Sequence, residues 1–439
     1  MAQSLSVLDG WCRSYGPVFS VKLATQSVIV LNSPEYVQKL LGSTDSNHFD
    51  KGYAYAALKP YWKDGLVVST GAKWKHHRRL LDKNMFSYKT LLGHMRIFNE
   101  DATLLVRSLG DNGGELIHEL LKSASHNSIM KATLGKQVDF ASSENGEMSL
   151  FEICLRAKQM IVKKVANPWL LFEPIWRLHP LSKVEDNISK LAWKYIRSYV
   201  AADDTDSIEE NNNFPLKQEL LAAGVSIEGV VEETATLLTA GSETTEIELQ
   251  LLFYMLALHP QHQELCRNEI DALFGNKEES HLEYQELTQL KYLEMCLNET
   301  LRLFPAIFLI MRSLKAPLRL ADDLELGVGT QVCMYFPGIH KNPEIYPNPE
   351  EFRPDRFSPE ESQQRDQYAY LPFSAGPRKC IGFKFAIMQM MCITAQVLRH
   401  YVISTTGTIE DIKLLPFVTL TLETPLKFEF QRRKHIPLL

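Results

Sequence analysis

The sequence has no uninterrupted apolar run long enough to cross a bilayer. A spanning helix needs roughly 20 apolar residues, and the longest candidate, from Phe304 to Met311, is far shorter. The first ten residues are neither long nor apolar enough for a signal peptide or a membrane anchor. Linkers rich in Pro, Gly or Ser and internal repeats are also missing. The 439 residues are therefore expected to form a single large domain over residues 1–439.

An excess of positive charge is absent as well, because the formal net charge is −6. This balance argues against nucleic acid as a partner. The 7 cysteines are odd in number and widely scattered, so they do not form the closely paired set of a disulfide scaffold, and a reducing compartment is favoured. The Gly-rich fingerprint of a dinucleotide or flavin site is missing too.

One cysteine lies in a loop of unusual composition. The stretch Phe373–Gly382 reads FSAGPRKCIG and precedes an apolar helical run that begins near Phe383. A helix N-terminus beside Arg378 is a setting that stabilises a thiolate. Gly376 is expected to take a positive φ, and N–H groups beyond the cysteine are expected to donate to its sulfur. A lone cysteine is most often a buried, inert residue, but this loop predicts that Cys380 is an axial ligand of a haem iron.

Two further stretches have patterns that admit two interpretations. Trp74 and Arg78 share a face of a basic helix, which alone indicates a surface helix with one packed Trp. The run Thr239–Thr245 reads TAGSETT in the middle of a long helix, from about Ser226 to Leu258. Because these residues are poor helix formers, the run predicts either a bulge that frees a carbonyl or a point where another helix crosses closely.

Taken together, these stretches resemble the cytochrome P-450 family of haem-thiolate monooxygenases. The loop meets the family pattern Phe-x-x-Gly-x-Arg-x-Cys-x-Gly at every fixed position, and residues 240–245 match the oxygen-activation motif. Glu299 and Arg302 match the family's Glu-x-x-Arg, and the elements follow the family's order from Trp74 to Phe385. The resemblance implies a mainly α fold with a minor β portion, and it is strongest to the animal microsomal clan that contains the fatty-acid ω-hydroxylases and related insect enzymes.

The resemblance also implies a role for each matching residue. Cys380 is the expected metal ligand, and Thr244 with Glu243 is expected to relay protons during O₂ activation. Glu299 and Arg302 are expected to form a structural lock with either Arg353 or Arg356. The implied cofactor-binding residues are Trp74, Arg78, Arg312, Phe373, Arg378 and Gly382, and the implied substrate pocket is lined by Thr236, Ala240, Ile307, Met311 and Phe417.

The cofactor and partners follow from the same resemblance. Many ω-hydroxylases carry a Glu that becomes ester-linked to the haem where this chain has Ala240, so haem b is expected to be held non-covalently. Electrons from NADPH are expected through NADPH–cytochrome P-450 reductase, with cytochrome b5 as a further candidate donor. The expected substrate is a lipophilic fatty acid, steroid-like hormone or xenobiotic. A basic face for the reductase is expected at Lys73, Lys75, Arg79, Lys379 and Lys384.

The stretch Ala166–Trp176 contains two Trp residues among apolar neighbours, which suits either core packing or a membrane surface. The resemblance implies the cytosolic face of the endoplasmic reticulum membrane. Microsomal members normally begin with an anchor helix and a Pro-rich hinge, and neither is seen; a truncated isoform, an incomplete gene model or a trimmed sequence would each account for this. Two alternatives stay open: a non-catalytic haem- or lipid-binding member, and an O₂-independent haem-thiolate isomerase, against which Glu243 and Thr244 argue.

Overall fold

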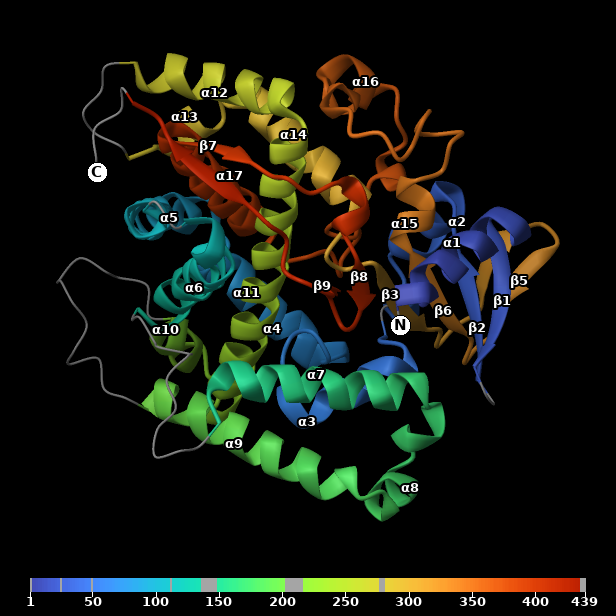
Figure 1. Cartoon of the computed structure of the whole chain (residues 1–439). Helices are drawn as coiled ribbons and strands as arrows, with labels where there is room; N and C mark the ends of the chain where they lie inside the picture. The colour runs from blue at the N-terminus through green and yellow to red at the C-terminus, as the bar shows by residue number, and fades with distance from the viewer. Residues whose placement is uncertain are drawn as a thin grey trace.

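The structure is a computed structural model that describes residues 2–23, 26–48, 50–110, 113–135, 148–201, 216–275 and 281–434. Within these residues the chain is mainly helical with a minor β portion, as the sequence predicted; a four-stranded sheet lies at one side and the two-stranded sheet that contains β7 (Tyr401–Ser404) lies toward the other (Figure 1). The sequence also predicts a solvated loop over the acidic, polar stretch from Ala201 to Asn213, which beyond Ala201 lies outside the described residues. Among the described helices, none combines the length and the apolar character that a bilayer span requires.

The β portion is built around one four-stranded sheet. The sequence predicts a hairpin from Val18–Leu23 and Ser27–Leu31, and this is confirmed, since β1 (Val18–Leu23) pairs antiparallel with β2 (Gln26–Leu31). Strand β2 runs parallel to β6 (Gln331–Tyr335), and β6 pairs antiparallel with β3 (Leu309–Ser313), which gives the order β1-β2-β6-β3. The two-stranded sheets are β4 (Leu318–Ala321) with β5 (Leu324–Leu326), β7 (Tyr401–Ser404) with β10 (Glu429–Arg432), and β8 (Leu414–Pro416) with β9 (Leu420–Leu422).

The helices make up most of the described chain. They are α1 (Ala2–Tyr15), α2 (Pro34–Leu41), α3 (Lys59–Trp62), α4 (Gly71–Asn84), α5 (Tyr88–Leu109), α6 (Gly113–Leu134), α7 (Leu150–Ala166), α8 (Glu173–Leu178), α9 (Leu181–Ala201), α10 (Leu216–Ala222), α11 (Ile227–Leu258), α12 (Pro260–Phe274), α13 (Tyr284–Leu287), α14 (Lys291–Leu303), α15 (Phe336–His340), α16 (Pro359–Gln363) and α17 (Phe383–His400). Short 3₁₀ turns include η2 (Tyr53–Leu58), η3 (Pro168–Leu171) and η5 (Pro354–Phe357).

Helix α11 passes through the middle of the molecule (Figure 1). It begins after Ser226, whose side-chain oxygen accepts the N–H of Gly229 as an N-cap, and it ends before Pro260. Because helices α6, α9, α14 and α17 pack around it, its residues are buried on most sides. It nevertheless carries several acidic residues, among them Glu233, Glu243 and Glu248, which bond to groups on other segments.

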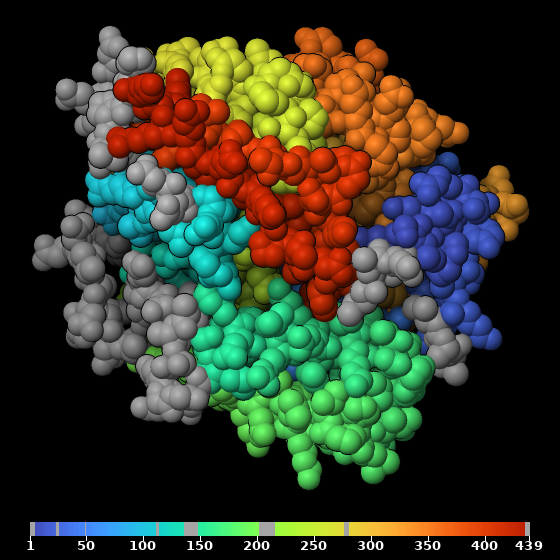
Figure 2. Space-filling view, viewed as in Figure 1, coloured from blue at the N-terminus to red at the C-terminus, as the bar shows by residue number. Residues whose placement is uncertain are grey.

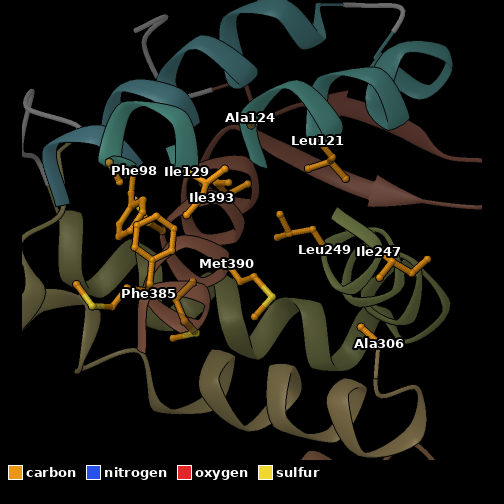
Figure 3. Packing of buried hydrophobic residues seen from close by; sticks show 14 of the residues in the cluster. Phe98, Leu121, Ala124, Ile129, Ile247, Leu249, Ala306, Phe385, Met390 and Ile393 are labelled. Carbon is orange, nitrogen blue, oxygen red and sulfur yellow. The ribbon is translucent and has the colours of Figure 1, made fainter. Parts of the chain in front are cut away.

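The main apolar core joins α11 to its neighbours. Phe385 of α17 packs edge-on against Phe98 of α5, with ring centroids 4.8 Å apart. Figure 3 shows this pair together with Met390 and Ile393 of the same helix. Residues Met388 to His400 are all buried, so α17 is anchored firmly behind the loop that precedes it. The core therefore fixes the start of α17, where the candidate cysteine lies.

Candidate active site

The cysteine loop is a tight turn closed by its own backbone. The N–H of Cys380 donates to the carbonyl of Phe373 at 2.9 Å, and the N–H of Lys379 donates to Gly376 at 3.1 Å. Gly376 has φ +70°, as predicted, and a Cβ there would overlap the carbonyl of Leu41. Only glycine fits such a position. The loop is thus held in one shape and delivers Cys380 just before α17 begins.

Cys380 differs from the other six cysteines because its side chain is exposed, whereas theirs are buried or half-buried. Protein nevertheless surrounds it, and this burial raises the pKa of its thiol. The N–H of Gly382 donates to the sulfur. This bond and the positive charge of Arg78 lower the pKa of the thiol and so offset part of the effect of burial. Cys392, by contrast, is fully buried in α17 and contacts Asn99. The donor at Gly382 is the one the sequence predicted, and the open side of Cys380 is what a metal needs.

Three arginines from distant segments meet beside this loop. Arg78 of α4 donates to the carbonyl of Lys379 at 2.7 Å, so it ties α4 to the cysteine loop. Arg378 lies 3.8 Å from the ring centroid of Trp74, a cation–π contact, and donates to the carbonyl of Ser69. Arg312 of β3 is 2 % exposed. The structure therefore brings together Trp74, Arg78, Arg312 and Arg378, four of the six residues that the resemblance assigned to cofactor binding.

A fourth cation, which sequence reasoning missed, belongs to the same group. Lys51 forms a β-bridge with Arg312, and its ammonium lies 4.6 Å from the ring centroid of Tyr55. Burial and the charges of Arg312, Arg378 and Arg78 lower the pKa of Lys51 well below its ordinary value. No short motif contains Lys51, and the β-bridge that places it cannot be read from the local sequence. We name Lys51, Arg78, Arg312 and Arg378 the cationic cluster.

The cationic cluster has too little negative charge around it. Burial and Arg312 lower the pKa of Arg378 to about 9, although Asp50 and Tyr55 raise it in part. The Nε and Nη1 atoms of Arg378 are buried without an acceptor, which is costly for a cation. Two carboxylates would supply both the missing charge and the missing acceptors, because Arg binds carboxylates through its planar fork. The residues present thus fit the propionates of a haem whose iron is bound by Cys380.

Thr236, Ala240 and Thr244, which the resemblance assigned to the substrate pocket and to O₂ activation, follow one another at four-residue spacing on one face of α11. We name this the distal face, because it would lie across the haem from Cys380. Thr236 is buried, whereas Ala240 is exposed and Thr244 half-buried in a stretch whose surroundings are mostly buried. The hydroxyl of Thr244 donates to the carbonyl of Ala240 at 3.0 Å. Ala240 and Thr244 are therefore the residues of this face that are open to a ligand.

The predicted bulge in this helix is not present, because α11 is α-helical throughout. The hydroxyls of Thr239, Ser242 and Thr245 donate to carbonyls four residues earlier, which keeps them satisfied inside a helix. A Cβ at Gly241 would lie 3.0 Å from the side chain of Ile129 in α6. The glycine is thus explained by the close crossing of α6, the other interpretation of this run.

Glu243 is paired in a way that the sequence did not indicate. Its carboxylate lies 2.8 Å from the ammonium of Lys158 in α7, and the side chains are 20 % and 19 % exposed. Nearby, burial and the charge of Glu243 raise the pKa of Glu246 to about 7. Glu243, which precedes Thr244 in the oxygen-activation motif, is therefore paired with a cation from the neighbouring helix α7.

The Glu-x-x-Arg pair is completely buried. Arg302 donates through Nε and Nη2 to both oxygens of Glu299, at 2.7 and 2.8 Å, and donates to the carbonyl of His340. Of the two arginines considered from the sequence, Arg356 reaches Glu299 with its side chain, at 3.2 Å, and Arg353 with its backbone N–H. Burial and Arg302 lower the pKa of His340 to about 3, so its neutral ring accepts the N–H of Leu371, just before the cysteine loop.

The segment after α14 connects the buried Glu299–Arg302–Arg356 group, which we name the lock, to α11 and to the β8–β9 hairpin. The N–H of Ala306 donates to Glu248 at 2.6 Å, and its carbonyl accepts the N–H of Leu420 at 2.8 Å. Burial raises the pKa of Glu248 to about 8. In this region Ile307 is half-buried, Met311 is buried against Gly52, and Phe417 is half-buried in the turn between β8 and β9.

The chain was compared with known proteins. The family model described as Cytochrome P450 matches residues 3–430. Relatives include cytochrome P450 4V2 of Homo sapiens, 30% identical over 422 residues (91% of this chain and 79% of the relative), and cytochrome P450 4d1 of Drosophila melanogaster, 27% identical over 445 residues (95% and 86%). Cytochrome P450 4c21 of Blattella germanica is 28% identical over 442 residues (94% and 85%).

These three names agree with the clan that the sequence predicted. The match extends over nearly the whole chain and includes the cysteine loop, the oxygen motif and the Glu-x-x-Arg pair. The chain therefore belongs to the cytochrome P450 family, and it is a haem-thiolate monooxygenase that takes electrons from a reductase and acts on lipophilic substrates.

Proposed function

We propose that Cys380 is the thiolate ligand of this monooxygenase and that the cationic cluster holds the haem propionates. The single observation that carries the proposal is the convergence of an exposed cysteine with four cations, one of which, Arg378, has buried donors without an acceptor. A haem held by these residues would supply the chemistry of O₂ activation that the monooxygenase reaction needs. Ala240 offers no carboxylate for an ester bond, so attachment is non-covalent. The relatives favour neither a binding protein nor an isomerase.

Proton delivery on the distal face is proposed for Thr244 and Glu243. The hydroxyl of Thr244 is bonded to a carbonyl of its own helix, which leaves its lone pairs free to accept a proton-donating water. The carboxylate of Glu243 lies 2.8 Å from the ammonium of Lys158, so the proposed relay requires Glu243 to leave this ion pair. Thr236, Ala240, Ile307, Met311 and Phe417 are proposed to line the substrate pocket.

Replacing Thr244 by Ala is expected to lower product formation about a hundredfold, the scale of one general acid–base group. Because reduction of the haem does not need this hydroxyl, NADPH consumption in the presence of reductase continues and the product formed per NADPH falls. The assay measures the product formed and the NADPH consumed in the same sample, and we call their ratio the coupling.

The matched control for this variant is Thr245→Ala. The hydroxyl of Thr245 is buried and donates to Gly241, so its loss leaves coupling nearly intact. Equal coupling in the Thr244→Ala variant and the unaltered protein would exclude the proposed relay.

The reductase is proposed to dock on the basic face beside the cysteine loop. Lys75, Arg79, Lys379 and Lys384 are exposed, and the ammonium of Lys379 lies 4.9 Å from the ring centroid of Phe383. Lys73 does not join them freely, because its ammonium pairs with Glu232 and Asp64. Cytochrome b5, if it donates electrons, would use the same face because it must approach the same edge of the haem.

A membrane-facing surface is proposed at η3 and α8, which supports attachment to the cytosolic face of the endoplasmic reticulum. Trp169, Phe172, Ile175 and Leu178 are 50%, 62%, 42% and 87% exposed. Such a cluster of large apolar side chains is unusual on a surface that faces only water. Figure 1 places α8 at one extremity of the molecule, and Figure 2 shows the green segment that contains it protruding from the body of the protein.

The double variant Trp169→Asp with Phe172→Asp is expected to bind phospholipid vesicles at least about tenfold more weakly, since burying each such side chain contributes more than 1.4 kcal/mol. Vesicle flotation measures the bound fraction. Leu104→Asp is the control, because Leu104 is 50% exposed on α5, far from α8 in Figure 1. If both proteins float equally, another surface meets the membrane.

A further inference from the structure

The structure assigns a positioning role to the buried carboxylate of Glu233 in α11, which holds the cationic cluster in its binding geometry. This inference rests on the proposed function of the cluster. Glu233 is 0% exposed, and no motif singled it out from the sequence. A carboxylate is rarely buried so completely unless it is bonded on both oxygens.

Both oxygens of Glu233 are indeed used, and they join segments that are far apart in the sequence. Oε1 lies 2.7 Å from Nδ1 of His77 in α4. Oε2 accepts the backbone N–H of Leu66 at 3.1 Å. His77 is one helical turn from Trp74 and adjacent to Arg78, so this contact fixes the rotation of α4 that points both residues toward the cysteine loop.

The second contact fixes the segment from Gly65 to Ser69. Gly65 lies so close to α11 that a Cβ would overlap the hydroxyl of Thr236 and approach the carbonyl of Glu232 to 2.8 Å. Val68 and Ser69 donate back to the carbonyl of Gly65 at 3.0 and 2.9 Å, which makes the segment a compact turn. The position of Ser69 therefore follows from where Leu66 is held.

Ser69 connects this segment to the cationic cluster through its backbone carbonyl, which Arg378 contacts. Its carbonyl accepts the N–H of Arg378 Nη2 at 2.8 Å, whereas the buried Nε and Nη1 of the same guanidinium have no acceptor among the described residues. The same guanidinium stacks on Trp74. Glu233 thus controls Arg378 by two routes, through the carbonyl of Ser69 and through the indole of Trp74.

The fold needs this support because the cations repel one another. Burial lowers the pKa of both Arg378 and Lys51. Repulsion from Arg312 and Arg78 lowers both further, and the charge of Arg378 also acts on Lys51. Flexible side chains would move apart to relieve this repulsion before an anion binds. A cluster that is held in place loses less conformational freedom on binding and so binds more tightly. Glu233 lies outside the cluster and provides this preorganisation.

The experiment measures haem release from the loaded protein to an excess of a haem-scavenging globin. Glu233→Gln keeps an acceptor for Leu66 but loses the charge and the second bond. Because hydrogen bonds to charged groups contribute roughly 1.5–3 kcal/mol, we expect haem release about tenfold faster. His77→Gln removes the other end of the same contact and is expected to act in the same direction, which keeps a test available if the first variant does not fold.

Two controls separate positioning from general destabilisation. Glu232→Gln changes the neighbouring acid, which pairs with Lys73 at the edge of a solvent-open recess and makes no side-chain bond to the 65–69 segment. Glu185→Gln breaks an equally buried pair with Lys164, 2.5 Å apart, on α9. Both are expected to release haem at the unaltered rate, although Glu185→Gln lowers the unfolding temperature.

The outcomes distinguish the positioning role of Glu233 from the proposed haem site formed by Cys380 and the cationic cluster. If Glu233→Gln releases haem no faster than Glu185→Gln, Glu233 is only a stabilising residue and the inference is wrong. A haem spectrum without a thiolate signature would contradict the Cys380 assignment alone, because the release rates still report on the cluster. A wild-type chain that binds no haem would overturn both, and haem that resists release even in acid would overturn non-covalent attachment.

Discussion

Replacing Cys380 by Ser is expected to abolish the thiolate-type spectrum of the reduced, CO-bound haem and to lower product formation by far more than a hundredfold. Outer partners of metal ligands already cost about 10- to 100-fold when mutated, and this change removes the ligand itself. The electron density that a thiolate donates to the iron favours cleavage of the O–O bond. An alkoxide cannot take its place at neutral pH, because a serine hydroxyl stays protonated.

The control for this variant is Cys392→Ser, which changes a cysteine fully buried in α17, twelve residues further along the chain. That variant is expected to lose some stability but to keep the thiolate spectrum. The absorbance of the CO-bound ferrous protein distinguishes the two. A thiolate band that survives in Cys380→Ser would show that another cysteine binds the iron.

The second large effect is expected at the buried lock. Glu299→Gln leaves Arg302 and Arg356 in the interior without their counter-charge, and breaking a buried pair in this way costs about 3–5 kcal/mol. A domain is typically stable by only about 5–15 kcal/mol. We therefore expect most of the protein to be recovered without haem and to unfold at a much lower urea concentration than the unaltered chain.

Glu294→Gln is a matched control on the same helix. Glu294 pairs with Lys291 at 3.3 Å, and the two side chains are 42% and 67% exposed. Such exposed pairs contribute about 0–1 kcal/mol, so this variant should unfold almost as the unaltered protein does. If the two variants have the same urea midpoint, the lock between α14 and η5 does not support the fold as we infer.

The sequence predicted those parts of the site that lie within short motifs. The loop of Cys380, the run on α11 and the Glu299–Arg302 pair are each contained in ten residues or fewer. Within such short stretches the backbone conformation depends mainly on residues that are close together in the sequence. The residue pattern therefore predicts the local structure. The positive φ of Gly376 and the sulfur-directed N–H of Gly382 followed from this coupling.

The partners that complete the site come from distant segments. Lys158 reaches Glu243, Lys51 joins Arg312 and Glu233 meets His77 across 85, 261 and 156 positions. Local periodicity contains no information on which helices pack side by side. The same limit explains why the sequence left two interpretations of Gly241 open, since the neighbour that decides it, Ile129, belongs to another helix.

The measurement that tests the central claim most directly is the absorption spectrum of the purified wild-type protein. It is recorded in the oxidised form during titration with fatty acids, steroids and xenobiotics, and then in the reduced form under CO. The account predicts a band of the thiolate-ligated type, and a shift of the oxidised haem to high spin when a lipophilic substrate displaces water from the distal face. A band of the imidazole-ligated type in the freshly prepared protein would contradict the assignment of Cys380 as the ligand.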